Sequence, residues 1–242
     1  MTKHKITYGD QVIPYTIKPD PKRHTKIAIH VEPNGTVVVD APPEFDLAVI
    51  HTAVQKRARW VVAHVGEALT RFAHVRPREY VSGEQIMYLG RRYVLKVITT
   101  CQKPRAVRLK GSRLEVETKS GDADDIKGRI RAWYRVKARD YFAKKIAETS
   151  DRLPWITEAP PFRLMDMTKQ WGSCSREGQV ILNPHLIKAP RNCIEYVIMH
   201  ELAHLKHHDH SAEFWRLIDI HQPKWRKAKS ELDALVEILT AE

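Results

Sequence analysis

A short pattern of histidines with one glutamate is the part of this 242-residue sequence with the clearest capacity for chemistry. Six of the 13 histidines lie within residues 200–221, and the pentapeptide His200-Glu201-Leu202-Ala203-His204 has the H-E-x-x-H spacing. Residues four apart lie on one face of a helix, so two imidazoles in these positions can bind one zinc ion at about 2.0–2.1 Å. The pattern therefore predicts His200 and His204 as ligands of a metal ion.

The residues around the pattern predict that it lies inside a buried helix. Asn192 and Glu195 have capping-box spacing, and an apolar run leads from there into His200. A surface helix with two unrelated histidines would have polar neighbours, whereas the neighbours here are apolar: Val197, Ile198, Leu202, Ala203 and Leu205. Glu201 projects from this apolar helix, where a carboxylate is costly to bury unless a metal ion or its bound water compensates the charge.

A third protein ligand must come from further along the chain, where four candidates lie: His207, His208, His210 and Glu213. On an uninterrupted helix, His207 would be about 10 Å and His210 about 15 Å along the axis from His200, too far to share one ion. If the helix ends after His204, the polar run that follows can fold back and deliver His210. The spacing from His204 to His210 equals that of the metzincin pattern H-E-x-x-H-x-x-G-x-x-H, with His207 in place of the glycine.

Upstream of the pattern, Trp171-Gly172-Ser173-Cys174 has the composition of a tight turn between two strands. Such a turn beside a metal ion can offer backbone N–H groups to a substrate. The alternative is structural, with Trp171 as a core anchor and Cys174 as a small buried residue. Cys174 is not predicted to bind zinc, because a fourth protein ligand would close the catalytic position. Asn183 and Tyr196 are weaker candidates for contacts with the substrate or with a metal ligand.

The elements that must position these residues lie in a mainly helical second part of the chain, residues 123–242. An apolar stripe predicts a helix over Asp124–Thr149, and Leu153–Pro161, with three prolines, is a connector. Two short strands are expected, over Phe162–Met167 and Gln179–Leu182. We predict that this part is a zincin-like catalytic domain with a small sheet.

Residues 1–122 are predicted to form a strand-rich antiparallel module. Short runs of alternating apolar and polar residues indicate its strands: Val12–Ile17, Lys26–Val31, Thr36–Val39, Gln85–Leu89, Tyr93–Thr99, Ala106–Leu109 and Arg113–Glu117. Between them, the three- and four-residue periodicity of Glu44–Phe72 predicts one long helix or two. The fold class expected for the whole chain is α+β.

The composition narrows the class of protein further. Hydrophobic residues make up 43% and charged residues 29%, as is typical of folded soluble proteins. The three cysteines cannot all pair, and no apolar segment has the length of a signal sequence or a membrane span, so we expect a cytoplasmic protein without a membrane partner. The net charge of +12 predicts non-specific affinity for nucleic acid. A line of four cations adds a secondary indication, although it is also typical of a solvated helix face: Lys127, Arg131, Arg135 and Arg139.

Several stretches together resemble the YgjP-like metallopeptidase family: Thr168–Ser175, Ile181–Asn183, Cys193–His204, His210-Ser211 and Phe214-Trp215. The strand-rich N-terminal half is also similar, so the resemblance extends over nearly the whole chain. It implies a small gluzincin-like domain related to SprT-like proteins, with His200, His204 and His210 as zinc ligands and Glu201 as general base. Gln170 stands where many relatives carry arginine, so the resemblance implies no anion contact at that position.

Three protein ligands and an open position predict metal-assisted hydrolysis with one Zn²⁺, in which Glu201 takes a proton from the attacking water. A polypeptide is the first substrate expected. Members of the YgjP-like family have also been assigned UTP pyrophosphatase activity, and the basic field of this chain suits a nucleotide, although no Gly-rich phosphate loop is present. A third hypothesis, which SprT-like relatives imply, is a nucleic-acid-associated protease, although the sequence contains no zinc knuckle.

Overall fold

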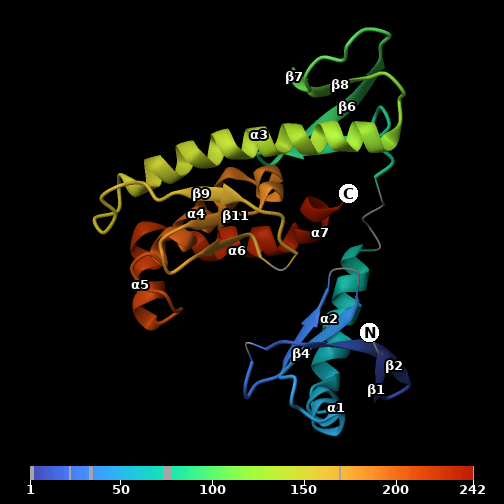
Figure 1. Cartoon of the computed structure of the whole chain (residues 1–242), viewed down its shortest axis with the longest axis vertical. Coiled ribbons are helices and arrows are strands. Elements are labelled where there is room, and N and C mark those ends of the chain that lie inside the picture. The colour runs from blue at the N-terminus through green and yellow to red at the C-terminus, as the bar shows by residue number, and fades with distance from the viewer. Residues whose placement is uncertain (1–2, 22, 33–34, 73–77, 169, 242) are drawn as a thin grey trace. The chain divides into compact units, whose positions relative to one another are not determined.

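The computed structural model describes residues 3–21, 23–32, 35–72, 78–168 and 170–241, and it divides into two compact units (Figure 1). The units are residues 1–77 and 78–242. This boundary differs from the expected one near residue 122. The reason is that the strands between residues 85 and 118 share their core with the long helix that follows them.

The first unit consists of the following elements: β1 (Lys3–Tyr8), β2 (Gln11–Pro19), β3 (Ala28–Val31), β4 (Val37–Ala41), α1 (Leu47–Gln55) and α2 (Ala58–Phe72). Its sheet has the order β1-β2-β4-β3, and β2 is parallel to β4, so the sheet is mixed and not antiparallel throughout. Val39 of the sheet and Ile50 of α1 belong to one buried core. The periodic segment is thus two helices. β1 was not predicted, since Ile6 is the one buried residue among its described side chains.

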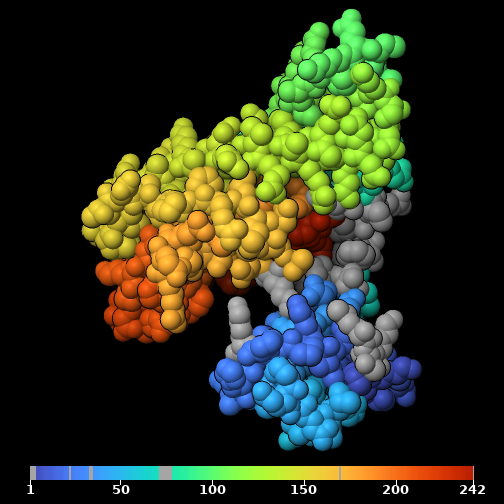
Figure 2. Space-filling model, viewed as in Figure 1, coloured from blue at the N-terminus to red at the C-terminus, as the bar shows by residue number. Residues whose placement is uncertain are grey.

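The second unit begins with a sheet and a long helix: β5 (Gln85–Tyr88), β6 (Arg91–Thr99), β7 (Arg108–Lys110), β8 (Arg113–Thr118) and α3 (Ala123–Ser150). The sheet has the order β5-β6-β8-β7 and lies against the N-terminal half of α3 (Figures 1 and 2). Leu95 and Leu114 of the sheet share a hydrophobic core with Ile126 and Ile130 of α3. This shared core holds the sheet in the second unit.

The rest of the second unit contains these elements: β9 (Phe162–Leu164), β10 (Gly172–Cys174), β11 (Val180–Leu182), the 3₁₀ helix η1 (Pro184–Lys188), α4 (Arg191–Ala203), α5 (Ala212–His221), α6 (Trp225–Ala234) and α7 (Val236–Thr240). The order β10-β11-β9 corrects the predicted turn at residues 171–174, because β10 is a strand antiparallel to β11. The turn comes later, where the Gly178 N–H donates to the Ser175 carbonyl at 3.1 Å. Gly178 has φ +84°, which favours glycine.

The helices and mixed sheets confirm the α+β fold class. Within the described part of the chain, no helix is both long and apolar enough to span a bilayer. All the residues predicted to carry chemistry lie in the second unit.

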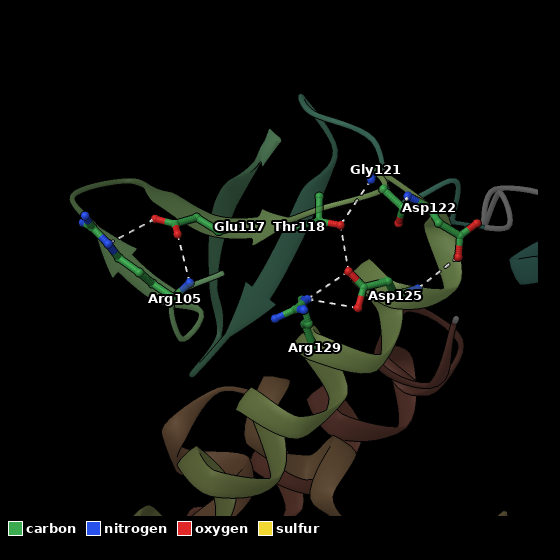
Figure 3. A network of polar contacts seen from close by, with 8 residues as sticks. Arg105, Glu117, Thr118, Gly121, Asp122, Asp125 and Arg129 are labelled. Carbon is green, nitrogen blue, oxygen red and sulfur yellow. Dashed lines mark hydrogen bonds and ion pairs between the residues drawn. The ribbon is translucent and has the colours of Figure 1, made fainter. Parts of the chain in front are cut away.

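A polar network fixes the start of α3 to the end of β8 (Figure 3). The hydroxyl of Thr118, a fully buried residue, donates to Asp125 Oδ2 at 2.7 Å and accepts from the Gly121 N–H at 3.2 Å. Arg129 Nε lies 2.9 Å from the same Asp125 oxygen, and Asp122 caps the helix by accepting from the Asp125 N–H at 3.3 Å. The Arg129 guanidinium first, and then the Thr118 hydroxyl, lowers the pKa of Asp125 below its ordinary value.

We expect Asp125→Asn to lower the free energy of unfolding by about 1 kcal/mol at pH 7, because it removes a charged hydrogen-bond acceptor that is partly exposed. Since the folded-state pKa is lowered, this stabilisation is present above the unfolded pKa of about 3.9 and is lost as the pH falls through the folded value. Urea denaturation followed by tryptophan fluorescence at pH 7 and at about pH 3 measures both effects.

Asp124→Asn is the matched control, because Asp124 is exposed in the same first turn of α3. It should change stability by less than Asp125→Asn at pH 7. An equal loss in the two variants, or a loss for Asp125→Asn that does not shrink at low pH, contradicts the role given to this network.

Candidate active site

Helix α4 carries the H-E-x-x-H pattern and has nine of its 13 residues buried. The predicted capping box is not formed. The Asn192 side chain donates to Glu231 Oε2 at 2.7 Å, and Glu195 forms an ion pair with Lys145 at 3.1 Å. The helix instead begins after Pro190 without a side-chain cap. Both polar residues thus anchor α4 to neighbouring helices.

The chain reverses direction directly after α4. The carbonyl of Ala203 accepts hydrogen bonds from two following N–H groups, and that of His207 is one of them, at 3.0 Å. No described residue of this turn has a positive φ, so His207 replaces the metzincin glycine without left-handed backbone. The reversal brings His210 back over α4, where its Nε2 atom lies 3.0 Å from Nε2 of His200.

Three imidazoles meet at this reversal and pack around one phenylalanine. Candidate ligand atoms of His200, His204 and His210 all lie within 4.8 Å of one another. The ring of Phe214, which is fully buried, lies 5.0, 4.6 and 4.8 Å from these three rings, centroid to centroid. Phe214 therefore supports all three histidines at once.

An aromatic column continues from His210 into the core. His210 stacks on Trp215 (5.6 Å, 26°), Trp215 on Trp225 (4.7 Å, 18°), and Trp225 on Tyr196 (6.0 Å, 14°). The Trp225 indole N–H donates to Asp219 Oδ1 at 2.7 Å, which fixes the middle of the column. The column therefore fixes the ring of His210, which is an exposed residue on a short connection between two helices.

The spacing of the three imidazoles, and the lowered pKa of two of them, suit a zinc ion. Burial, together with the charges of His204 and His210, lowers the pKa of His200 to about 3, and burial also lowers the pKa of His204. His204 Nδ1 lies 3.0 Å from the His207 carbonyl, which can only accept, so its Nε2 retains a free lone pair. Tetrahedral zinc ligands lie about 3.3 Å apart, close to the spacing of the His200 and His210 nitrogens. Three imidazoles in this arrangement fit a zinc ion.

Glu201 lies beside the histidines and against the backbone of β10. Its side chain is buried, which raises its pKa to about 8, and a cation at the three histidines would oppose this shift. A Cβ atom at Gly172 would lie 2.6 Å from Glu201 Oε1, so only glycine leaves room for the carboxylate. Burial, with a smaller effect of Glu201, raises the pKa of the Cys174 thiol to about 11.

A cavity of about 430 Å³ opens onto these groups. Five of the six predicted contact residues line it: Trp171, Gly172, Ser173, Cys174 and Tyr196. Asn183 is not among its lining residues, because its buried amide donates to the Met167 carbonyl at 2.7 Å and its oxygen caps η1. His208, one of the candidates for the third ligand, also lines the cavity. The lining residues that were not predicted are Gln170, Val197, Lys229, Leu232 and Asp233. The last three come from α6, which packs on α4.

We expect Gly172→Ala to displace the Glu201 carboxylate while the protein keeps its metal content. The added Cβ meets three atoms of Glu201 within 2.9 Å, and a displacement of about 1 Å at a catalytic group can cost about 100-fold in rate. A crystal structure of the variant, with its metal content and hydrolytic rate, measures the effect. Gly128→Ala, at a glycine of α3 with no atom within 4 Å of an added Cβ, is the control. An unmoved carboxylate in Gly172→Ala contradicts this role.

Trp215→Leu should weaken zinc binding by about 10- to 100-fold, because it removes the ring on which His210 stacks. Competition with a chromophoric chelator measures the affinity. Trp60→Leu, which removes a half-exposed tryptophan of the first unit, should leave the affinity unchanged. Equal zinc affinities for Trp215→Leu and the unmodified protein would rule out a positioning role for the column.

Comparison with solved structures finds two similar chains, both metallopeptidase zymogens. Abylysin of Pyrococcus abyssi is 22% identical over 41% of this chain and 96% of its own, with a TM-score of 0.35. Jannalysin of Methanocaldococcus jannaschii is 17% identical over 40% of this chain and 93% of its own, with a TM-score of 0.32. No curated protein matches the chain.

The model of the YgjP-like metallopeptidase domain matches residues 25–235. The match includes the three histidines, Glu201, the β10 strand and most of the first unit. It thus extends over most of the sequence, as the resemblance predicted. The chain belongs to the YgjP-like family of metallopeptidase domains.

Proposed function

We propose that this chain is a zinc-dependent peptidase in which His200, His204 and His210 hold the ion and Glu201 is the general base. The convergence of the three imidazoles and the membership of a metallopeptidase family support this proposal. A bound zinc ion would supply Lewis acidity, which makes water a better nucleophile and polarises a carbonyl. The donor set offers three protein ligands, which leaves a position for substrate.

In this proposal, Glu201 moves the proton. Its side chain lines the same cavity as the histidines and lies directly against Gly172. It accepts a proton from the attacking water and then gives it to the amine that leaves as the peptide bond breaks. Burial in an apolar helix excludes competing bulk water from the carboxylate.

The open edge of β10 is the observation that most favours a polypeptide substrate. β10 is an edge strand of its sheet and lines the cavity beside Glu201. Hydrogen bonds at Trp171 and Ser175 join it to the segment of β11. In an antiparallel pair, residues that form hydrogen bonds with the partner strand alternate with residues whose N–H and C=O groups point away from that strand. Gly172 and Cys174 therefore offer main-chain partners to an extended peptide, which can add to the sheet as a further strand.

The nucleotide alternative has weaker support from the cavity. Among the described lining residues, Lys229 is the one lysine or arginine, and it forms an ion pair with Asp233 of the same helix. A triphosphate needs several cations or backbone N–H groups around it, as phosphate-binding loops provide. UTP pyrophosphatase activity therefore remains the second candidate for the same metal site, on the strength of the positive charge of the chain.

Glu201→Gln should retain its zinc and lose hydrolysis of an unstructured polypeptide by about 100- to 10,000-fold, as expected for removal of a general base. Glu213→Gln, an exposed glutamate in the first turn of α5, is the matched control and should behave like the unmodified protein. Zinc content is measured for all three proteins by atomic emission.

The same three proteins are assayed against a panel of nucleoside triphosphates. Release of pyrophosphate that depends on Glu201, with no peptide cleavage, overturns the peptidase proposal in favour of the nucleotide alternative. Full peptide cleavage by zinc-loaded Glu201→Gln removes Glu201 from the mechanism.

A further inference from the structure

The sheet β5-β6-β8-β7 has one face in the core and one face toward solvent. Ile86, Leu95, Leu114 and Val116 are buried in the core that includes α3. Side chains alternate between the two faces of a strand, so the residues between these core positions form the outer face. Residues that lie opposite one another on neighbouring strands share a face of the sheet. Leu95 lies opposite Leu114, and Leu114 lies opposite Leu109, so all three face the core.

The outer face, with the segment just before β7, is strongly cationic. Its charged residues are six cations and two carboxylates: Arg92, Lys96, Arg105, Arg108, Lys110, Arg113, Glu115 and Glu117. Both carboxylates are already engaged, Glu115 with Arg108 at 3.1 Å and Glu117 with Arg105 and Arg108. The remaining four cations are exposed, and no ion pair joins them to a described carboxylate: Arg92, Lys96, Lys110 and Arg113.

The register puts these four cations into one patch. Arg113 lies opposite Val94 of β6, midway between Arg92 and Lys96, and Lys110 lies opposite Arg113 on the next strand. With about 3.3 Å per residue and about 4.8 Å between strands, the patch extends about 13 Å along β6 and about 10 Å across the sheet. Each strand of a duplex carries one phosphate for every 3.4 Å or so of the helix axis, so the patch can contact several of them.

We propose that this outer face binds the phosphate backbone of double-stranded nucleic acid without reading its sequence. The face favours a duplex over a single strand, because the described residues of its strands include no outward aromatic ring on which an unpaired base could stack. Lysine and arginine on a rigid sheet match a regular row of phosphates by charge. This inference is independent of the proposed peptidase function, since binding is measured without hydrolysis.

Protection of the sheet edge accounts for only part of this positive charge. Cations on an edge strand keep a sheet from pairing with other chains, and Lys110 on β7 has this position. Arg92, Lys96 and Arg113 lie on the two central strands, where no edge needs protection.

The line of cations on α3 is a weaker binding surface than the sheet. Arg135 of this line forms an ion pair with Asp166 at 3.1 Å, and Lys127 lies over the Tyr80 ring. These contacts compete with phosphate for two of the four side chains, so the sheet is the better candidate.

The test is binding of the full chain to a fluorescein-labelled DNA duplex of random sequence, measured by anisotropy from 50 to 200 mM salt. The double variant Arg92→Glu, Arg113→Glu is compared with Arg216→Glu, Lys227→Glu. The control pair changes the net charge equally at exposed positions on α5 and α6, outside both cationic surfaces. Thermal unfolding and size-exclusion chromatography establish that all proteins are folded and of the same size.

We expect the sheet variant to bind roughly tenfold or more weakly at 100 mM salt, and the slope of log K against log salt to fall by about two. The control variant should retain most of the affinity and the full slope. Equal weakening in both variants overturns the proposal, because it assigns binding to the net charge alone. Aggregation of the sheet variant with unchanged DNA affinity also overturns it, as does tighter binding to single strands or to anionic lipid vesicles than to duplex.

Discussion

The reversal of the chain after α4, closed by packing three histidines around Phe214, is the constraint on which the site depends. A helix alone can present His200 and His204, but it carries any later histidine away along its axis. The reversal returns His210 to within 3.0 Å of His200, and the column that begins at Trp215 holds it there. Local backbone hydrogen bonds set the turn, while tertiary aromatic packing fixes the positions of the three histidines.

This arrangement places ionisable groups in an apolar core, where their charged forms are unfavourable. Burial lowers the pKa of His200 and raises that of Glu201, so both neutral forms are favoured without a cation. A metal ion bound at the histidines would require their neutral form, which the low pKa provides, and its charge would lower the raised pKa of Glu201. Gly172 completes the arrangement because its missing side chain lets the carboxylate approach an open strand edge.

The sequence predicted the elements with strong periodicity and missed those set by tertiary contacts. The α3 helix, most strands and the end of α4 followed from local pattern and spacing. Residues 171–174 were predicted as a turn because three of the four are small. Residues 172–174 instead form β10, and periodicity does not identify the strand with which it pairs, β11. The sequence around Asn183 does not indicate that its amide donates to a backbone carbonyl. Nor does the sequence of α6 indicate that Lys229 and Asp233 line the cavity. The domain boundary was misplaced because α3 shares a core with strands before it.

X-ray absorption spectroscopy at the zinc edge of the purified protein tests the central claim most directly, because it counts and identifies the atoms bound to the ion. We predict three imidazole nitrogens and one light ligand from water, with nitrogen distances of about 2.0–2.1 Å. A sulfur scatterer at about 2.3 Å would contradict this prediction, since that distance would make a cysteine such as Cys174 a ligand and close the open position. A protein purified without stoichiometric metal that takes up none from added zinc would contradict it equally.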